Sequence, residues 1–297
     1  MKRYKDIAGD GGSDVAGQVA AQQARLRARM ATIQRKVAVV SGKGGVGKSS
    51  VTANLAAALA ADGFAVGVLD ADLNGPSIGT MLGVRDQRLR VTAAGVVPAV
   101  SADGVRVLSM DLLLPSDETP VVWDAPTQAE AHTWRGAMEA NALREFLADT
   151  AWGTLDVLLL DLPPGSDRLP VVTGLLPDLA GAVVVTLPSE VSHLVVKKSI
   201  TAAREAGTAI LGLVENMAGY VCLQCGSVGT LFEGPGGGET ARQLGIPFLG
   251  RVPFDPRLAA AADRGRPFVL DHGETPAGRA LRAVAAELVG TLLRSSR

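Results

Sequence analysis

The sequence has few cysteines, few aromatic residues, no excess of one charge and no long apolar run. Its 297 residues include two cysteines and 4% aromatic side chains, and the formal net charge is −1. Two cysteines cannot build a disulfide framework, so we expect a cytoplasmic protein whose cysteine pair binds metal or does redox chemistry. No apolar run approaches the roughly 18 residues of a membrane span. Balanced charge argues against nucleic-acid binding, and we therefore predict neither a membrane nor a nucleic-acid partner.

From residue 36 onward, short apolar runs alternate with segments of helix length. Such runs are typical of strands buried on both faces of a parallel sheet. We predict an α/β fold, a doubly wound and mostly parallel sheet flanked by helices, with its ligand site beyond the carboxyl ends of the strands. This single domain spans 36–297, and 1–35 form an N-terminal extension that is partly disordered or helical. The predicted strands are 37–40, 65–69, 105–110, 157–160, 182–187 and 210–214.

A glycine-rich segment follows the first predicted strand. Residues 41–50 read Ser-Gly-Lys-Gly-Gly-Val-Gly-Lys-Ser-Ser and fit the phosphate-loop pattern G-x-x-x-x-G-K-[ST]. Glycines let backbone N–H groups turn toward one anion. Lys48 would neutralise the β/γ-phosphates and Ser49 would give its hydroxyl to Mg²⁺, whereas a plain strand-to-helix turn is the alternative. The expected nucleotide-binding residues of this loop are Gly42, Lys43, Gly44, Gly45, Val46, Gly47, Lys48, Ser49 and Ser50.

Carboxylates follow the second and fourth predicted strands. Asp70 and Asp72 end an apolar run, where two acids are costly unless they serve a cation or a proton. Mg²⁺ and an attacking water supply both, and an Asx-type turn is the alternative. Asp161 begins the segment Asp-Leu-Pro-Pro-Gly, in which the acid suits second-shell magnesium binding, unless the segment is only a rigid turn.

Two further signals follow the sixth predicted strand. The amide of Asn216 matches the N6/N7 edge of adenine, although an asparagine there also suits a helix cap. Cys222 and Cys225 form a C-x-x-C turn, which aims two thiolates at one metal. Two thiolates are only half of a tetrahedral set, and the sequence holds no second pair. On chemistry alone, a [4Fe–4S] cluster or Zn²⁺ would fit.

Lys43 makes the phosphate loop resemble the deviant Walker A of the SIMIBI P-loop ATPases, a class that includes MinD, ParA, nitrogenase iron protein and the Mrp/ApbC proteins. In that class the first lysine reaches across a sandwich dimer to the partner's nucleotide, much as an arginine finger supplied in trans does. The resemblance implies a homodimer and a catalytic role for Lys43. Two C-x-x-C turns could then meet on the symmetry axis and complete four sulfur ligands.

Residues 214–226, Val-Glu-Asn-Met-Ala-Gly-Tyr-Val-Cys-Leu-Gln-Cys-Gly, and 247–256 resemble the Mrp/ApbC iron–sulfur carrier ATPases, and the resemblance extends over about 36–269. It implies a slow ATPase that holds a [4Fe–4S] cluster between two subunits and passes it to apo iron–sulfur proteins. It also implies that Asn216, Pro253 and Asp255 form the purine pocket.

The resemblance extends to the two switch segments. Residues 70–77 look like the family's switch I, which implies that Asp72 orients or deprotonates the water and that Asp70 helps Ser49 and Asp161 hold Mg²⁺. In switch II the family continues P-P-G-T-G-D, whereas this chain has Ser166 and Asp167 after Gly165. Residues 124–132 look like an insertion.

A MinD/ParA-like positioning or switch ATPase with structural zinc at Cys222 and Cys225 is the alternative function. The stretch 281–292 lacks the aromatic residues and dense lysines of a membrane-surface helix, which disfavours this reading. Electron transfer as in nitrogenase iron protein is disfavoured because the cluster cysteines of that protein lie far apart in sequence.

Overall fold

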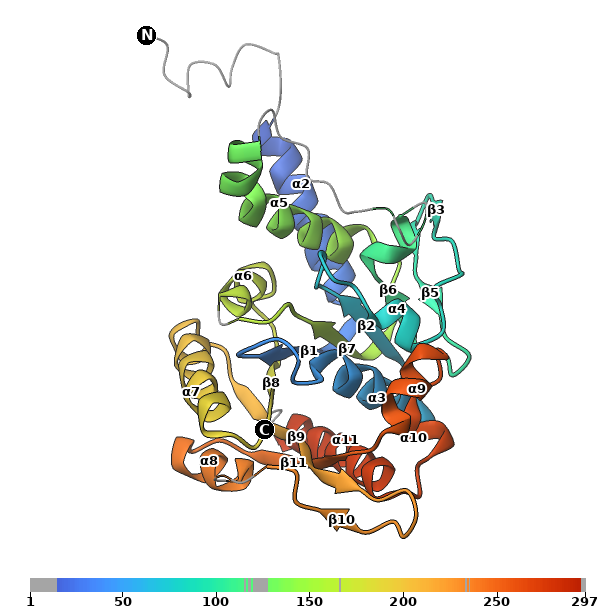
Figure 1. Cartoon of the computed structure of the whole chain (residues 1–297). Coiled ribbons are helices and arrows are strands. Elements are labelled where there is room, and N and C mark those ends of the chain that lie inside the picture. The colour runs from blue at the N-terminus through green and yellow to red at the C-terminus, as the bar shows by residue number, and fades with distance from the viewer. Residues whose placement is uncertain are drawn as a thin grey trace.

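A nine-stranded sheet forms the centre of the molecule (Figure 1). The computed structural model describes residues 15–114, 116, 119, 128–165, 167–232, 234 and 236–294, except the side chains at 15–16 and 128–135. The strand order is β10-β9-β8-β1-β7-β2-β6-β5, with β11 paired to β9. A separate hairpin joins β3 to β4. The strands are β1 (Ile33–Ser41), β2 (Val66–Asp70), β3 (Arg90–Thr92), β4 (Gly95–Val97), β5 (Ala99–Val100), β6 (Arg106–Leu108), β7 (Leu155–Asp161), β8 (Gly181–Thr186), β9 (Ile210–Val221), β10 (Val228–Gly229) and β11 (Phe248–Phe254).

The strands that surround β1 run parallel. β1 pairs with β7 on one side and β8 on the other, and β2 and β9 extend the two halves in the same direction. The six predicted strands correspond to β1, β2, β6, β7, β8 and β9. In such a sheet the loops at the carboxyl ends meet at one edge, where the strand order reverses. This edge therefore brings together the loops that follow β1, β2, β7 and β9.

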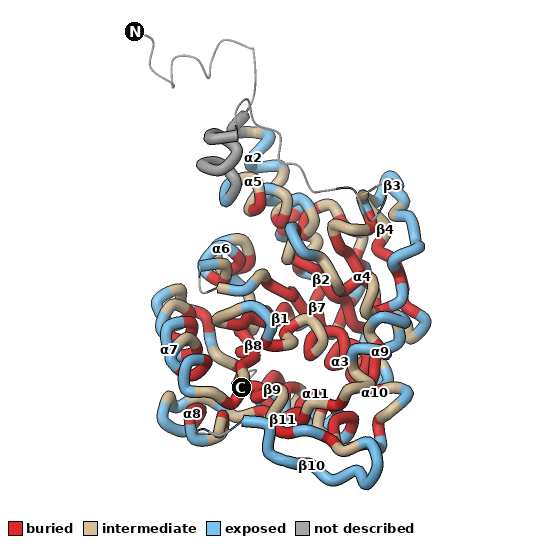
Figure 2. The backbone as a smooth tube through the Cα atoms, viewed as in Figure 1, coloured by how far each residue is buried: buried red, intermediate tan, exposed pale blue. Residues whose placement is uncertain are grey.

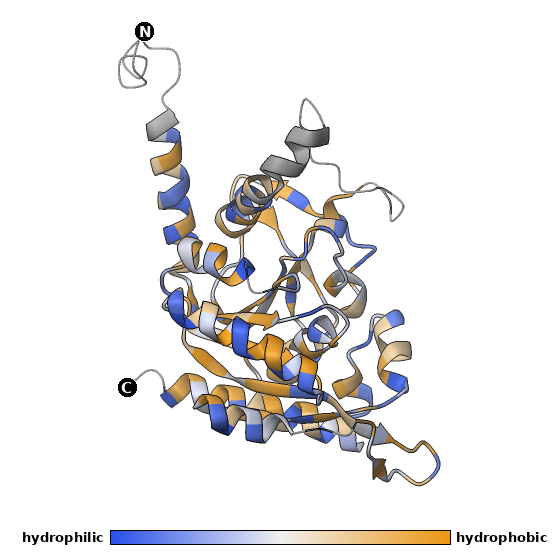
Figure 3. Cartoon of the chain, turned by 60° about the vertical axis from the view of Figure 1, so that its left-hand side comes forward, coloured by the Kyte–Doolittle hydropathy of each residue, from blue (hydrophilic) through white to orange (hydrophobic). Residues whose placement is uncertain are grey.

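Helices cover both faces of the sheet. Because successive strand residues point to opposite faces, Val37 and Val39 join a core with α3 and α11, whereas Ala38 and Val40 join a second core with α2, α5, α6 and α7. Figure 2 shows both cores as buried backbone, and Figure 3 shows the sheet as mostly hydrophobic. The helices are α2 (Val15–Met30), α3 (Lys48–Ala61), α4 (Ile78–Met81), η1 (Met110–Leu113), α5 (Gln128–Asp149), α6 (Arg168–Leu175), α7 (Glu190–Glu205), α8 (Gly237–Leu244), α9 (Arg257–Asp263), α10 (Phe268–Asp271) and α11 (Pro276–Arg294).

The N-terminal helix α2 packs against the domain. Leu26 and Met30 lie one turn apart and are both buried in the second core. Arg25 also forms an ion pair with Asp149 at the end of α5 (3.3 Å).

The division of the chain at residue 35 stays a prediction. Residues 1–14 and, within the expected insertion, 124–127 lie outside the described residues, and 128–132 begin α5.

The C-terminal helix α11 is part of the core. Leu281, Ala285 and Leu288 are buried against the sheet, so the apolar side of this helix faces inward. None of the helices in the described part of the chain is long and apolar enough to cross a membrane.

Candidate nucleotide-binding and metal-binding sites

The phosphate loop connects β1 to α3. Gly45 and Gly47 have φ of 77° and 79°, the left-handed region that glycine adopts without a steric penalty. A Cβ at Gly47 would lie 2.2 Å from Nδ2 of Asn216, so this position accepts only glycine as the loop stands. α3 begins at Lys48, and Gly47 offers it no side-chain cap. Its first N–H groups and the positive end of its dipole therefore point toward the loop, as in an anion site.

Asp161 gathers three side chains of α3 at the end of β7. Its Oδ2 lies 2.6 Å from both Nζ of Lys48 and Oγ of Ser49, and its Oδ1 accepts a 2.6 Å hydrogen bond from Thr52. Asp161 is fully buried and Lys48 is 7% exposed, so the charges compensate each other away from bulk water. The structure thus brings Lys48, Ser49 and Asp161 together. Thr52 was not predicted, although a hydroxyl four residues after Lys48 falls on the same helix face.

Asp70 lies beside Asp161, in register on the neighbouring strand. It is fully buried and accepts hydrogen bonds from the backbone of Ser77 and Ile78 and from Oγ of Ser109 (2.8, 3.0 and 3.1 Å). Burial and then the negative charge of Asp161 raise the pKa of Asp70 to about 7. Two carboxylates this close are stabilised by a cation or a proton. The pair therefore fits a magnesium site that also includes the Ser49 hydroxyl.

Asp72 opens the loop after β2. The residue is half-buried, its N–H donates to Asp70, and its carbonyl accepts from Gly75 (3.2 Å), which closes the turn through main-chain atoms. Lys43 is half-buried in the phosphate loop, beside the exposed Gly44. The catalytic roles of Asp72 and Lys43 stay predictions.

The loop after β7 lies against the phosphate loop. Gly165 has a φ of 122° and donates its N–H to the carbonyl of Ser41 (3.0 Å). A Cβ at Gly165 would approach Oδ1 of Asp167 to 2.7 Å. Ser166, one of the two residues that depart from the family pattern, lies outside the described residues.

The residues predicted for the purine pocket make contacts of their own. Asn216 donates from Nδ2 to the carbonyl of Val46 (2.8 Å) and so ties β9 to the phosphate loop. Asp255 is fully buried, and both of its oxygens accept from the guanidinium of Arg257 (2.9 and 2.7 Å). Burial alone would raise the pKa of Asp255, but these hydrogen bonds outweigh it and lower that pKa. Arg257 was missed because nothing in the sequence marks it as the partner of Asp255. Pro253 is buried in β11, and its purine role stays a prediction.

The C-x-x-C turn forms the tip of the hairpin between β9 and β10 (Figure 2). Gly226, with a φ of 72°, donates its N–H to the carbonyl of Cys222 (2.8 Å) and closes the turn. Cys222 is half-buried and Cys225 is exposed, and neither forms a disulfide. The hydroxyl of Ser227, 3.0 Å from the sulfur, lowers the pKa of Cys225 and so favours the thiolate that binds metals. Within the described residues, no group of three or more Cys, His, Asp or Glu could hold a metal.

Several large apolar side chains close in sequence to this turn are exposed. Each of them is at least 40% exposed. Val228 pairs with Val221 across the hairpin, so Val228 and Tyr220 lie on opposite faces of it. The exposed residues are Tyr220, Leu223, Val228, Leu231 and Phe232.

The parallel sheet, the loop 41–50 and the acids at the ends of β2 and β7 define a P-loop NTPase. The chain belongs to the ParA family of NUBPL iron-transfer P-loop NTPases, whose pattern matches residues 32–289.

Relatives of similar length support this assignment. The iron–sulfur cluster carrier protein of Saccharolobus solfataricus is 45% identical over 273 residues, which cover 92% of this chain and 88% of the relative. The carrier protein of Methanocaldococcus jannaschii is 46% identical over 253 residues, 85% of this chain and 83% of the relative. A nucleotide-binding protein from Archaeoglobus fulgidus, solved in complex with ADP, is 38% identical with a TM-score of 0.70 and covers 82% of this chain and 91% of its own. The predicted fold class and the resemblance to the iron–sulfur carriers are thereby confirmed.

His193 on α7 lies outside these sites, and its burial should make the folding stability of the protein depend on pH. It is 5% exposed, and Nδ1 lies 3.0 Å from the hydroxyl of Thr240. Burial is the main cause that lowers its pKa, with Glu215 opposing. As pH falls below about 6.5, the unfolded chain therefore takes up the proton before the folded one, and stability is lost. We expect the free energy of unfolding, measured by urea denaturation, to decrease as the pH falls from about 6.5 to 5. This decrease should be smaller in His193→Gln than in the wild type.

The matched control is Leu194→Gln, an exposed position of the same helix without a titratable group, which should keep the wild-type pH dependence. The same slope in His193→Gln and in the wild type would show that His193 does not contribute to it.

Proposed function

We propose that this protein is an ATP-hydrolysing carrier that holds a labile [4Fe–4S] cluster between two copies of the chain and transfers it to apo iron–sulfur proteins. The observation that carries the proposal is the hairpin tip with Cys222 and Cys225. It is exposed, and it supplies two sulfur ligands where a cluster needs four. A second copy related by a two-fold axis would supply the other two.

The surroundings of the turn support cargo exchange. Ser227 keeps Cys225 closer to its thiolate form, and exposed apolar side chains near the turn, such as Leu223, are suited to contact another protein. A cluster held at a surface tip is accessible to the thiolates of a recipient, which a deeply buried cluster is not. A cytoplasmic location stays a prediction from the sequence.

The phosphate loop supplies the ATP site in this proposal. Lys48 and the N-terminus of α3 would bind the phosphates, and Ser49 with Asp161 and Asp70 would hold Mg²⁺. When bound, Mg²⁺ would neutralise charge on the β- and γ-phosphates. In the structure Lys48 and Ser49 both contact Asp161, so ATP binding would exchange part of these contacts for phosphate and Mg²⁺.

The packing of α11 supports the carrier over a MinD/ParA-like positioning ATPase. Leu281, Leu288 and Leu292 are buried, so the apolar face of this helix is already used in the core. A helix that binds a membrane surface must expose such a face.

Anaerobic reconstitution with iron and sulfide tests the proposal. We expect about four iron and four sulfide per dimer, with sedimentation showing a dimer, and transfer to an apo-acceptor that ATP modulates. One full cluster per monomer, or zinc that resists iron loading, would instead favour a structural metal in a switch ATPase.

Asp72→Asn should separate ATP binding from turnover. The substitution removes the group expected to orient or deprotonate the attacking water but keeps the turn, which main-chain atoms close. We expect Mg²⁺-ATP to bind as in the wild type and kcat to fall on the order of 10²-fold.

Single-turnover kinetics and equilibrium titration of ATP measure the two effects. Asp62→Asn, at the exposed end of α3, is the control and should leave both unchanged. Wild-type turnover in Asp72→Asn would reduce Asp72 to a turn residue.

A further inference from the structure

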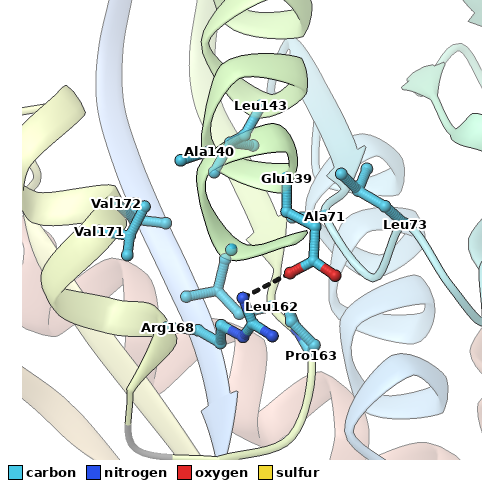
Figure 4. A pocket seen from close by; sticks show the side chains of 11 residues that line it. Ala71, Leu73, Glu139, Ala140, Leu143, Leu162, Pro163, Arg168, Val171 and Val172 are labelled. Atoms are coloured by element: carbon cyan, nitrogen blue, oxygen red, sulfur yellow. Dashed lines mark hydrogen bonds and ion pairs between the residues drawn. The ribbon is translucent and has the colours of Figure 1, made fainter. Parts of the chain in front are cut away.

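One carboxylate joins the loop after β2 to the loop after β7, two neighbouring strands on the same side of β1. Glu139 on α5 accepts a hydrogen bond at Oε1 from Nδ2 of Asn74 (2.8 Å), in the loop after β2. Its Oε2 lies 2.5 Å from a guanidinium nitrogen of Arg168, at the start of α6. Figure 4 shows the contact between Glu139 and Arg168. The three residues come from separate parts of the chain, so the link is a product of the tertiary fold.

The carboxylate of Glu139 sits in apolar surroundings. Its side chain is 9% exposed and borders a small pocket of about 30 Å³. A buried carboxylate is costly unless it is paired and hydrogen-bonded. Arg168 compensates the charge of Glu139, and the amide of Asn74 donates to one of its oxygens. Ala71, Leu162 and Val172 belong to one apolar core, and the N–H of Ala71 donates to the carbonyl of Asp161 (2.9 Å), so the two loops are already joined where they leave the sheet. Glu139 adds polar contacts further along both loops, at Asn74 and Arg168. The apolar lining of the pocket includes Ala71, Leu73, Leu143, Leu162 and Val172 (Figure 4).

The two partners of Glu139 are close in sequence to the residues that the ATPase would use. Asn74 is two residues after Asp72, and Arg168 is three residues after Gly165, whose N–H contacts the phosphate loop. We propose that Glu139 is a positioning residue that makes the loops after β2 and β7 move as one unit, so that the expected water-orienting acid and the loop facing the γ-phosphate are placed together. This inference rests on the ATPase function proposed above.

This link lies at the departure from the family's switch II pattern. The second glycine of P-P-G-T-G-D is missing here, and Asp167 and Arg168 follow instead. Arg168 contacts Asp167 (3.4 Å) as well as Glu139. A loop with one glycine fewer has fewer backbone conformations, and the ion pair to α5 fixes it further.

Hydrogen exchange tests the link without requiring turnover. In the full-length protein we expect Glu139→Ala to speed amide exchange at least threefold in both 73–77 and 167–172, because both loops lose their common anchor. Glu145→Ala is the matched control, since Glu145 is an exposed residue of the same helix, and it should change neither loop. Faster exchange in one loop alone, or in neither, would overturn the proposal.

A charge exchange tests the role in turnover. Glu139→Arg and Arg168→Glu should each lower kcat about tenfold and change ATP affinity less than threefold, as expected for misplaced rather than lost groups. The double variant restores opposite charges, and the amide of Asn74 can accept a hydrogen bond as well as donate one. We therefore expect it to recover most of kcat.

A double variant no better than the worse single variant, while folded by its melting temperature, would contradict a direct pair. If the singles do not fold, Glu139→Gln, which keeps the shape and an acceptor for Asn74 but loses the charge, replaces them and should still lower kcat. A wild-type protein without ATP turnover would defeat the proposed function. The hydrogen-exchange experiment does not depend on turnover, so it would still decide whether Glu139 links the loops.

Discussion

Alanine at Cys222 or at Cys225 should abolish cluster binding and leave ATP binding intact. This is the expected result if each chain supplies two of four sulfur ligands, because one substitution removes two ligands from a symmetric dimer. The cysteines lie at the tip of the β9–β10 hairpin, whereas Lys48 lies at the start of α3. The nucleotide site therefore keeps its structure in either variant.

The measurements are the visible charge-transfer absorbance and the iron and sulfide content after anaerobic reconstitution. Gln224→Ala, an exposed residue between the two cysteines, is the matched control and should keep the cluster. Transfer to an apo-acceptor should be lost together with the absorbance. A cluster retained in either single variant would contradict a site that needs all four thiolates.

Features that depend on residues close together in the sequence could be predicted from the sequence. The phosphate loop is contiguous, and its pattern includes the strand before it and the helix after it. The six predicted strands are apolar runs, and such runs are buried on both faces of the sheet. β1 begins four residues before the predicted 37, because it contains the buried Lys36. That lysine pairs with Asp178 (2.5 Å), a contact across the fold that no local pattern reveals.

The remaining parts depend on contacts between distant segments. β11 was missed because its apolar run is interrupted by Gly250, Arg251 and Pro253. β9 continues past the predicted end at 214 through the buried Glu215 and Asn216. The local sequence does not identify Glu139 either, since its importance comes from two loops that the fold brings to it.

Lys48→Ala and Lys43→Ala should fail in different ways. Lys48 is buried, and its Nζ lies 2.6 Å from Asp161, so its loss removes the main phosphate cation and leaves Asp161 without its ion pair. We expect ATP binding to be lost. Lys43 is only half-buried in the loop. Its loss should preserve ATP binding and abolish hydrolysis, if its charge serves the partner's nucleotide. Equilibrium titration and phosphate release measure the two effects.

Mixing two inactive variants decides whether Lys43 acts in trans. In a heterodimer of Lys43→Ala and Asp72→Asn chains, the site on the first chain keeps its own Asp72 and receives Lys43 from the second. The other site lacks both groups. In a random mixture about half of the dimers are heterodimers, and one of the two sites in each heterodimer is active. Mixing should therefore restore about a quarter of wild-type turnover. If Lys43 acts within its own chain, both sites of the heterodimer are defective and mixing restores nothing. Wild-type hydrolysis by Lys43→Ala alone would remove the residue from the mechanism altogether.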